Sequence, residues 1–326
     1  MTVEKNVILD GVDVPLSPLV LGTMTFGDTV DAATAEEILE AALAAGITGI
    51  DTANGYAKGT TESLIAPWVA RHRDEIVLAT KAGMPHPDAG AHSPLSRAGL
   101  RAGVEGSLRR LGVDRVDLFY LHQPDRLAPL AETLETVAEL HAEGKISALG
   151  VSNYAAWQVV DLLAACERAG APRPVVAQNV YSILARRAED EWFECARTHG
   201  VATMVYNPLA GGLLARRPST GGTPDRFRGS VLADMYRQRY LSDAVLDAAE
   251  ALADVADQAG LSQAELALRW AAGAEGTDAL LLGASRPAQL AANLAAVGRG
   301  PLPTDVLEAV DRATAPVRGF MPRYNR

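Results

Sequence analysis

Eight short apolar runs constrain the fold of this 326-residue chain more than any other feature of its sequence. They are rich in valine, isoleucine and leucine, and they lie at residues 17–22, 46–50, 75–79, 116–121, 146–151, 174–178, 201–206 and 278–283. Runs without a regular polar alternation are typical of strands that are buried on both faces, as in a parallel sheet. Segments with helical spacing lie between them. The chain is therefore predicted to repeat a strand and a helix eight times.

Residues that start and stop helices support this division. Thr34 and Glu37 have the spacing of a capping box, and Gly46 supplies a stop for the helix that follows them. Ser262 and Glu265 repeat the capping-box pattern before a later helix. We therefore expect helices to begin close to each of these pairs.

The strand and helix count favours the α/β class and a closed (β/α)8 TIM barrel. An open dinucleotide-binding sheet would carry a GxGxxG motif after its first strand, and the sequence has none there. Three additions are expected: an N-terminal hairpin turning at Asp10–Gly11, a long loop after strand 7 from Asn207 to about Tyr240, and an extra C-terminal helix over 303–314. No linker marks a boundary, so residues 1–326 are predicted to form a single domain.

Charge and composition narrow the choice of partner. The formal net charge is -10 and the lysines and arginines are scattered, so no basic patch suited to nucleic acid is expected. The sequence lacks a signal-peptide pattern and any run of about 18 apolar residues, which predicts no membrane association and a cytoplasmic location. Cys166 and Cys195 lie in different predicted helices and are interpreted as unpaired thiols. The oligomeric state stays open.

Polar side chains follow the apolar runs at the points where the predicted strands end. Asp51 and Tyr56 follow the second run, Lys81 the third and His122 the fourth. The carboxyl ends of barrel strands meet at one face, where barrel enzymes build their sites. These four side chains are therefore expected to share one mouth of the barrel.

The chemistry that this group supports is proton donation to a carbonyl oxygen. A buried Lys81 needs a counter-charge, and Asp51 is the nearest acid. A phenol is a weak acid near neutrality, but an adjacent Lys81 cation is expected to lower the pKa of Tyr56 by roughly 1–3 units. His122 would hold or polarise the carbonyl oxygen. None of these side chains can donate a hydride, so a cofactor is required.

A metal-dependent barrel hydrolase is the alternative chemistry. His86 and His92 flank the loop after the third strand and could join His122 and Asp51 around a metal. Their positions lack the strand-end spacing that would match His122. We therefore predict that no metal is bound.

The motifs resemble those of the aldo-keto reductase family along nearly the whole chain. They are DTANGY at 51–56, Lys81 in ATKAG, DLFYLHQPD at 117–125, LGVSNYAAWQ at 149–158, YNPLAGGLL at 206–214 and GASRPAQLAAN at 283–293. The resemblance implies a (β/α)8 barrel that binds NADPH in an extended form and reduces a small-molecule aldehyde or ketone. It also implies that Tyr56 is the general acid, that Lys81 and Asp51 tune it, and that His122 orients the substrate.

The resemblance also implies a set of cofactor contacts. Ser152, Asn153 and Gln178 match positions that bind the nicotinamide carboxamide, and Tyr206 matches the aromatic residue that stacks on the ring. Arg286 suits a 2′-phosphate and so favours NADPH over NADH. The remaining predicted contacts are Gly22, Thr23, Asn207, Leu209, Gly211, Leu213, Gly283, Ser285, Gln289 and Asn293.

The resemblance leaves two predictions for the substrate, because the two halves of the chain resemble different groups of the family. The second half of the chain is most similar to aflatoxin-aldehyde and succinic semialdehyde reductases, which implies that Arg237 or Arg239, together with Arg326, holds a substrate carboxylate. The loops after the first, fourth and seventh strands are expected to form the substrate pocket, with Met24, Phe26 and Trp157 as candidate apolar contacts. The first half also resembles reductases of nucleotide-linked keto-deoxysugars. A further alternative is a non-catalytic regulatory subunit of the potassium-channel β type, which would not need a complete set of acid-base residues.

Overall fold

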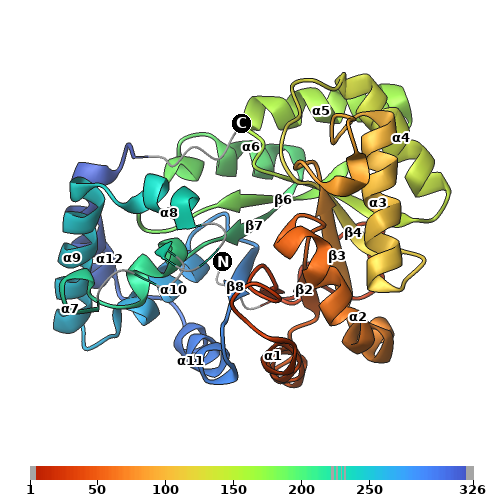
Figure 1. The fold of residues 1–326 in the computed structure, drawn as a ribbon. Coiled ribbons are helices and arrows are strands. Elements are labelled where there is room, and N and C mark those ends of the chain that lie inside the picture. The colour runs from red at the N-terminus through yellow and green to blue at the C-terminus, as the bar shows by residue number, and fades with distance from the viewer. Residues whose placement is uncertain (1–4, 222–223, 225–226, 229, 231–232, 321–326) are drawn as a thin grey trace.

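The computed structural model describes residues 5–221, 224, 227–228, 230 and 233–320. Its centre is a closed barrel of eight parallel strands in which each strand pairs with its neighbours in sequence and β8 pairs with β1 (Figure 1). The strands are β1 (Leu19–Gly22), β2 (Gly49–Asp51), β3 (Val77–Ala82), β4 (Val116–Leu121), β5 (Ile146–Ser152), β6 (Pro174–Val180), β7 (Ala202–Tyr206) and β8 (Ala279–Gly283). Each predicted run overlaps one of these strands, so the predicted (β/α)8 TIM barrel is confirmed.

Helices alternate with the strands and cover the outside of the barrel (Figure 1). Between β1 and β7 they are α1 (Ala32–Ala44), α2 (Thr60–His72), α3 (Arg97–Leu111), α4 (Leu130–Ala142), α5 (Ala156–Ala169) and α6 (Trp192–His199). After β7 come α7 (Pro218–Gly221), α8 (Ala233–Tyr240), α9 (Asp243–Gln258), α10 (Gln263–Gly273), α11 (Pro287–Gly298) and α12 (Thr304–Thr314). The extra C-terminal helix is present as predicted, whereas the predicted long loop after strand 7 carries α7 and α8 in its described part.

The barrel interior is filled by side chains from alternate strand positions. Val20, Ala79, Leu118 and Met204 belong to this inner cluster, which is separate from the larger core between the sheet and the helices. Tyr120 of β4, the register partner of Lys81, is a fully buried member of this inner cluster. The polar residues at the strand ends therefore rest on a packed floor.

The N-terminal hairpin is small and turns at Asp10–Gly11, as predicted. Among the described residues it has a single antiparallel bridge, between Val7 and Leu16, with Asp10 and Gly11 in the turn. Leu9 and Leu16 pack into the inner cluster at the amino ends of the strands. The hairpin therefore closes the end of the barrel opposite the polar mouth.

One predicted capping box is wrong. Helix α1 is capped by Asp31, whose carboxylate accepts a hydrogen bond from the Thr34 backbone N–H at 2.8 Å. An aspartate carboxylate reaches the free N–H groups of a first turn as well as a threonine hydroxyl does, so the helix starts three residues earlier than expected. Ser262 does cap α10, through its hydroxyl and the Glu265 N–H at 3.1 Å. Across the described part of the chain, no helix is both long enough and apolar enough to cross a membrane.

Candidate active site

Parallel pairing of β2 with β3 brings Asp51 and Lys81 together at the carboxyl end of the barrel. The Lys81 ammonium donates to the Asp51 carboxylate at 2.5 Å, to the Thr52 carbonyl at 2.9 Å and to the Tyr56 hydroxyl at 3.2 Å. The side chains of Lys81 and Asp51 are almost wholly buried. One cation therefore links a carboxylate to a phenol inside the protein.

A strained turn positions Tyr56. The short 3-10 helix η1 (Tyr56–Gly59) places Ala57 at φ 44° and Lys58 at φ 55°, in the left-handed region that residues with a β-carbon rarely adopt. Gly59 follows at φ 92°, and a β-carbon there would meet the Arg110 side chain at 2.9 Å. This compact turn directs the Tyr56 side chain toward Lys81.

Burial decides the acidity of Tyr56. Desolvation raises the pKa of its hydroxyl above the ordinary value, and Lys81 offsets only part of that rise. The expected net lowering is therefore wrong for the protein alone, although the Lys81 cation acts in the predicted direction. For Lys81, burial lowers the pKa but Asp51 and Tyr56 raise it by more, so the ammonium is retained at neutral pH.

His122 directly follows β4 and faces the same mouth. Its ring lies edge-on to Tyr56, with the ring centroids 6.0 Å apart and the planes at 80°. Burial, followed by the Lys81 cation, lowers its pKa to about 3, so the imidazole is neutral at pH 7. Its buried Nδ1 has no hydrogen-bond partner among the described residues. A neutral imidazole suits an orienting group better than a proton reservoir.

Gln178 extends this network in a way that the sequence did not reveal. Its amide donates to the second oxygen of the Asp51 carboxylate at 2.8 Å. Asp51 is therefore shared between Lys81 and Gln178, a residue expected to contact the cofactor. The contact crosses the barrel from β6 to β2, and no local sequence pattern encodes it.

Ser152, Asn153 and Tyr206 form a second group beside His122. Asn153 adopts a left-handed conformation, φ 62°, and its amide donates to the His122 carbonyl at 2.9 Å and to the Ser152 hydroxyl at 3.0 Å. The Tyr206 hydroxyl donates to the Asn153 amide oxygen at 2.6 Å. The structure thus brings these predicted contacts together next to His122.

The loop after β7 is held by Asn207, which is also left-handed at φ 64°. Its side-chain oxygen accepts from the Gly211 N–H at 2.6 Å, and its amide donates to the Tyr240 hydroxyl of α8 at 2.7 Å. A β-carbon on Gly211 would come within 2.5 Å of the Tyr236 ring. Leu213 is buried and Leu209 is half-buried in the same loop. Helix α8 therefore packs directly against the loop that carries these predicted cofactor contacts.

Tyr236 of α8 is a further aromatic residue near Tyr56 and was not among the predicted contacts. Its phenol is close enough to Tyr56 to contribute to the raised pKa of that hydroxyl. Tyr236 lies within the same YRQRY segment as the two candidate arginines, and nothing in that segment distinguishes it from an ordinary helix-surface tyrosine.

The remaining predicted contacts lie around β1, β8 and the start of α11. Arg286 is exposed immediately before Pro287, and the Ser285 hydroxyl and N–H both donate to the Gln289 side chain at 2.9 Å. Asn293 is buried, and its amide nitrogen has no partner among the described residues. That unsatisfied donor and the exposed Arg286 fit an adenosine phosphate.

Gly22 and Gly283 pair at the adjoining ends of β1 and β8, so backbone alone faces the mouth there. The Thr23 hydroxyl donates to the Asp51 carbonyl at 3.0 Å. Met24 is half-buried, whereas Phe26 is fully buried in the outer core and forms part of the packing.

The substrate arginines do not form a cluster in the described residues. Arg237 is paired with Asp234 and also donates to the Phe227 carbonyl. Arg239 is half-buried on the same helix, and Arg326 lies outside the described residues. Within the described ranges, no group of three or more His, Cys, Asp and Glu side chains is arranged to hold a metal ion.

Comparison with known proteins identifies the class of protein that this fold and site define. The model of the aldo/keto reductase family matches residues 18–315, and the chain belongs to that family. It is 39% identical to aldo-keto reductase family 7 member A3 of Homo sapiens, over 94% of this chain and 96% of that protein.

Two further relatives are named for different functions, one as a reductase and one as a channel subunit. The chain is 37% identical to aflatoxin B1 aldehyde reductase member 2 of Rattus norvegicus, over 96% of this chain and 89% of the relative. It is 32% identical to a probable voltage-gated potassium channel subunit beta of Arabidopsis thaliana, over 87% of this chain and 88% of the relative.

Proposed function

We propose that this protein reduces an aldehyde or ketone to an alcohol with NADPH, and that Tyr56 is the proton donor. The observation that carries the proposal is the buried chain of contacts from Asp51 through Lys81 to the Tyr56 hydroxyl. A phenol held against an ammonium can release its proton to an oxygen that is gaining negative charge, because the cation stabilises the phenolate left behind.

Each of the four side chains has a distinct task in this proposal. Tyr56 gives its proton to the carbonyl oxygen, and Lys81 stabilises the resulting phenolate. Asp51 holds Lys81 in place through the 2.5 Å contact. Neutral His122 donates a hydrogen bond to the same carbonyl oxygen and orients it. When bound, NADPH supplies the hydride that the carbonyl carbon accepts.

The residues around the mouth fit that cofactor. Ser152, Asn153 and Gln178 would bind its carboxamide, Tyr206 would lie against its nicotinamide ring, and the 207–214 loop would follow its pyrophosphate. Asn293 supplies an unsatisfied buried donor for the adenosine end.

A change at Arg286 tests the choice between NADPH and NADH. Arg286→Leu removes the exposed guanidinium proposed to pair with the 2′-phosphate. We expect KM for NADPH to rise by about tenfold or more, with KM for NADH little changed, because charged hydrogen bonds of this kind contribute about 1.5–3 kcal/mol. Steady-state kinetics with both cofactors makes the measurement. An equal change for the two would contradict the assignment.

Aldehydes are the substrate class that we propose first, because the Rattus norvegicus relative is named for an aldehyde. Nucleotide-linked keto-deoxysugars are the alternative. NADPH oxidation followed across semialdehydes, aromatic aldehydes, dicarbonyls and nucleotide-linked ketosugars separates the two classes.

The decisive variant is Tyr56→Phe. It removes the proton donor but keeps the ring, so we expect kcat to fall by about 10²–10⁴-fold while NADPH affinity is retained. Tyr181→Phe is the matched control, because the buried Tyr181 hydroxyl donates to Glu189 at 2.8 Å, away from the strand-end group. Normal turnover in Tyr56→Phe would refute the role of Tyr56. A wild-type protein that binds NADPH but reduces nothing would favour the regulatory-subunit alternative.

A further inference from the structure

Glu62 is a buried carboxylate that has no task in the proposed reduction. It lies in the first turn of α2, three residues after Gly59, and it is 0% exposed. A buried charge is unfavourable unless it is paired and hydrogen-bonded. The contacts of Glu62 therefore need an explanation of their own.

The two oxygens of Glu62 reach two different elements. One accepts a hydrogen bond from the Thr80 hydroxyl of β3 at 2.6 Å, and the other accepts from Arg110 Nε of α3 at 2.7 Å. Thr80 directly precedes Lys81, and successive side chains of a strand point to opposite faces. Lys81 therefore faces the barrel interior, while Thr80 faces the helices and meets Glu62.

Arg110 also supports the turn that carries Tyr56. Its side chain lies so close to Gly59, the last residue of η1, that a β-carbon on this glycine would meet it at 2.9 Å. Two residues of the turn are left-handed, and such a conformation persists only where neighbouring contacts impose it. The Arg110 side chain supplies one of these contacts.

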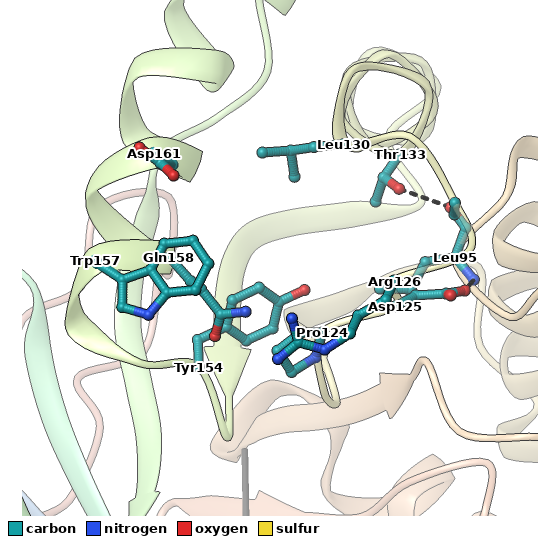
Figure 2. Close-up of a pocket in the computed structure, with 11 residues that line it drawn as sticks. Leu95, Pro124, Asp125, Arg126, Leu130, Thr133, Tyr154, Trp157, Gln158 and Asp161 are labelled. Atoms are coloured by element: carbon teal, nitrogen blue, oxygen red, sulfur yellow. Dashed lines mark hydrogen bonds between the residues drawn. The ribbon is translucent and has the colours of Figure 1, made fainter. Parts of the chain in front are cut away.

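The loop between β3 and α3 holds Arg110 from another side. The guanidinium donates to the Asp88 carboxylate of this loop at 2.8 Å. The far end of the loop is tied to α4, because the Thr133 hydroxyl donates to the Leu95 carbonyl at 2.8 Å, the dashed line in Figure 2. The Asp125 carboxylate also accepts from the Leu95 N–H at 3.0 Å. Asp88 therefore belongs to a loop that is fixed at its other end.

We propose that Glu62 is a positioning residue, which fixes the turn that carries Tyr56 against the strand that carries Lys81. This role rests on the proposed function of Tyr56 as the proton donor. The Tyr56 hydroxyl lies 3.2 Å from the Lys81 ammonium, and a displacement of about 1 Å in such a site can lower a rate by about 10²-fold. Glu62 acts through the two elements that it joins, and not by contact with the reacting groups.

Thr80→Val tests the role without removing a charge. Valine keeps the branched shape of threonine but lacks the hydroxyl that contacts Glu62. We expect kcat to fall by about tenfold or more and KM for NADPH to stay within about twofold, because only the geometry of Tyr56 and Lys81 is disturbed. Thr80→Ser restores the hydroxyl and should keep kcat within about twofold of wild type.

Thr203→Val is the matched control. Thr203 is also a buried threonine of a barrel strand, and its hydroxyl accepts from the Trp192 indole N–H at 3.1 Å. Its strand, β7, lies across the closed barrel from β3. In urea unfolding both variants should lose stability, but Thr203→Val should keep kcat within about twofold of wild type. Equal losses of kcat in the two variants would overturn the proposal.

A double variant shows whether Thr80 acts through Tyr56. Tyr56→Phe already lacks the proton donor, so adding Thr80→Val should not lower the residual kcat further. A further tenfold fall in this background, or an unchanged kcat in Thr80→Val alone, would overturn the positioning role and leave the proposed function intact. Normal turnover in Tyr56→Phe would refute the proposed function and the positioning role with it. Where Thr80→Val does not fold, Glu62→Gln replaces it with the same expected results, because an amide cannot accept hydrogen bonds at both of its ends.

Discussion

Lys81 and Asp51 form a buried ion pair whose presence needs a physical explanation. Buried ion pairs add little net stability, and well-packed apolar pairs often replace them without loss. Here the pair also touches Tyr56 and Gln178. The burial of these two charges is therefore better explained by their contacts with Tyr56 and Gln178 than by a contribution to the stability of the fold.

The buried His122 makes the stability of the protein depend on pH. Its pKa is about 3 in the folded protein, against about 6.5 in an unfolded chain. Only the unfolded state gains a proton between these values, so this contribution to stability is complete above pH 6.5 and is lost as the pH falls toward 3. From pH 7 to pH 5 we expect His122 to lower the free energy of unfolding by about 2 kcal/mol.

Urea unfolding of the wild type and of His122→Gln at both pH values makes the measurement. The variant lacks the titrating imidazole, so its stability should fall by about 2 kcal/mol less over this interval. Equal losses in the two proteins would mean that His122 is not held neutral by the fold.

At the scale of elements, neighbouring strands divide the barrel interior between large and small residues. Tyr120 of β4 faces Gly150 of β5, and the two are register partners. A β-carbon on Gly150 would lie 2.6 Å from the Tyr120 ring. The glycine is required by this close approach, since its backbone does not adopt a left-handed conformation.

Gly150→Ala should therefore destabilise the barrel by about 1–3 kcal/mol through overpacking. The expected fall in midpoint is measured by urea unfolding. Gly298→Ala is the control, because a β-carbon at Gly298, the last residue of α11, meets nothing within 4 Å. Equal stability of the Gly150 variant would show that Tyr120 can shift at no cost.

The sequence predicted where the turns after the strands lie, but it did not predict their backbone conformation. DTANGY and the SNY motif identified Tyr56 and Asn153 as site residues. The left-handed conformations of Ala57 and Lys58 could not be read from residue type, because alanine and lysine seldom adopt them. Such strain persists only where surrounding contacts impose it.

At the scale of the whole molecule, one end of the barrel is closed by apolar packing and the other carries the polar strand-end residues. The hairpin closes one end through Leu16, whose side chain would overlap a β-carbon on Gly49. The strand-end polar residues occupy the other end. Stability and chemistry should therefore be separable by mutation.

Leu16→Ala tests this separation. Emptying a buried leucine position should lower the free energy of unfolding by about 2–5 kcal/mol. The kcat for carbonyl reduction, measured well below the unfolding temperature, should stay within about twofold of wild type. The space left by the leucine side chain lies at the end of the barrel opposite the strand-end polar residues. A large loss of kcat in folded protein would contradict this division.

The sequence alone determined the barrel and the identity of its four strand-end side chains, because parallel buried strands have a distinctive composition and their carboxyl ends must meet. It also determined the family, through motifs spread over the chain. Only the tertiary structure decided the sharing of Asp51 between Lys81 and Gln178, the raised pKa of Tyr56 and the approach of Tyr236. These properties depend on burial and on distances between residues far apart in sequence, which no local pattern specifies.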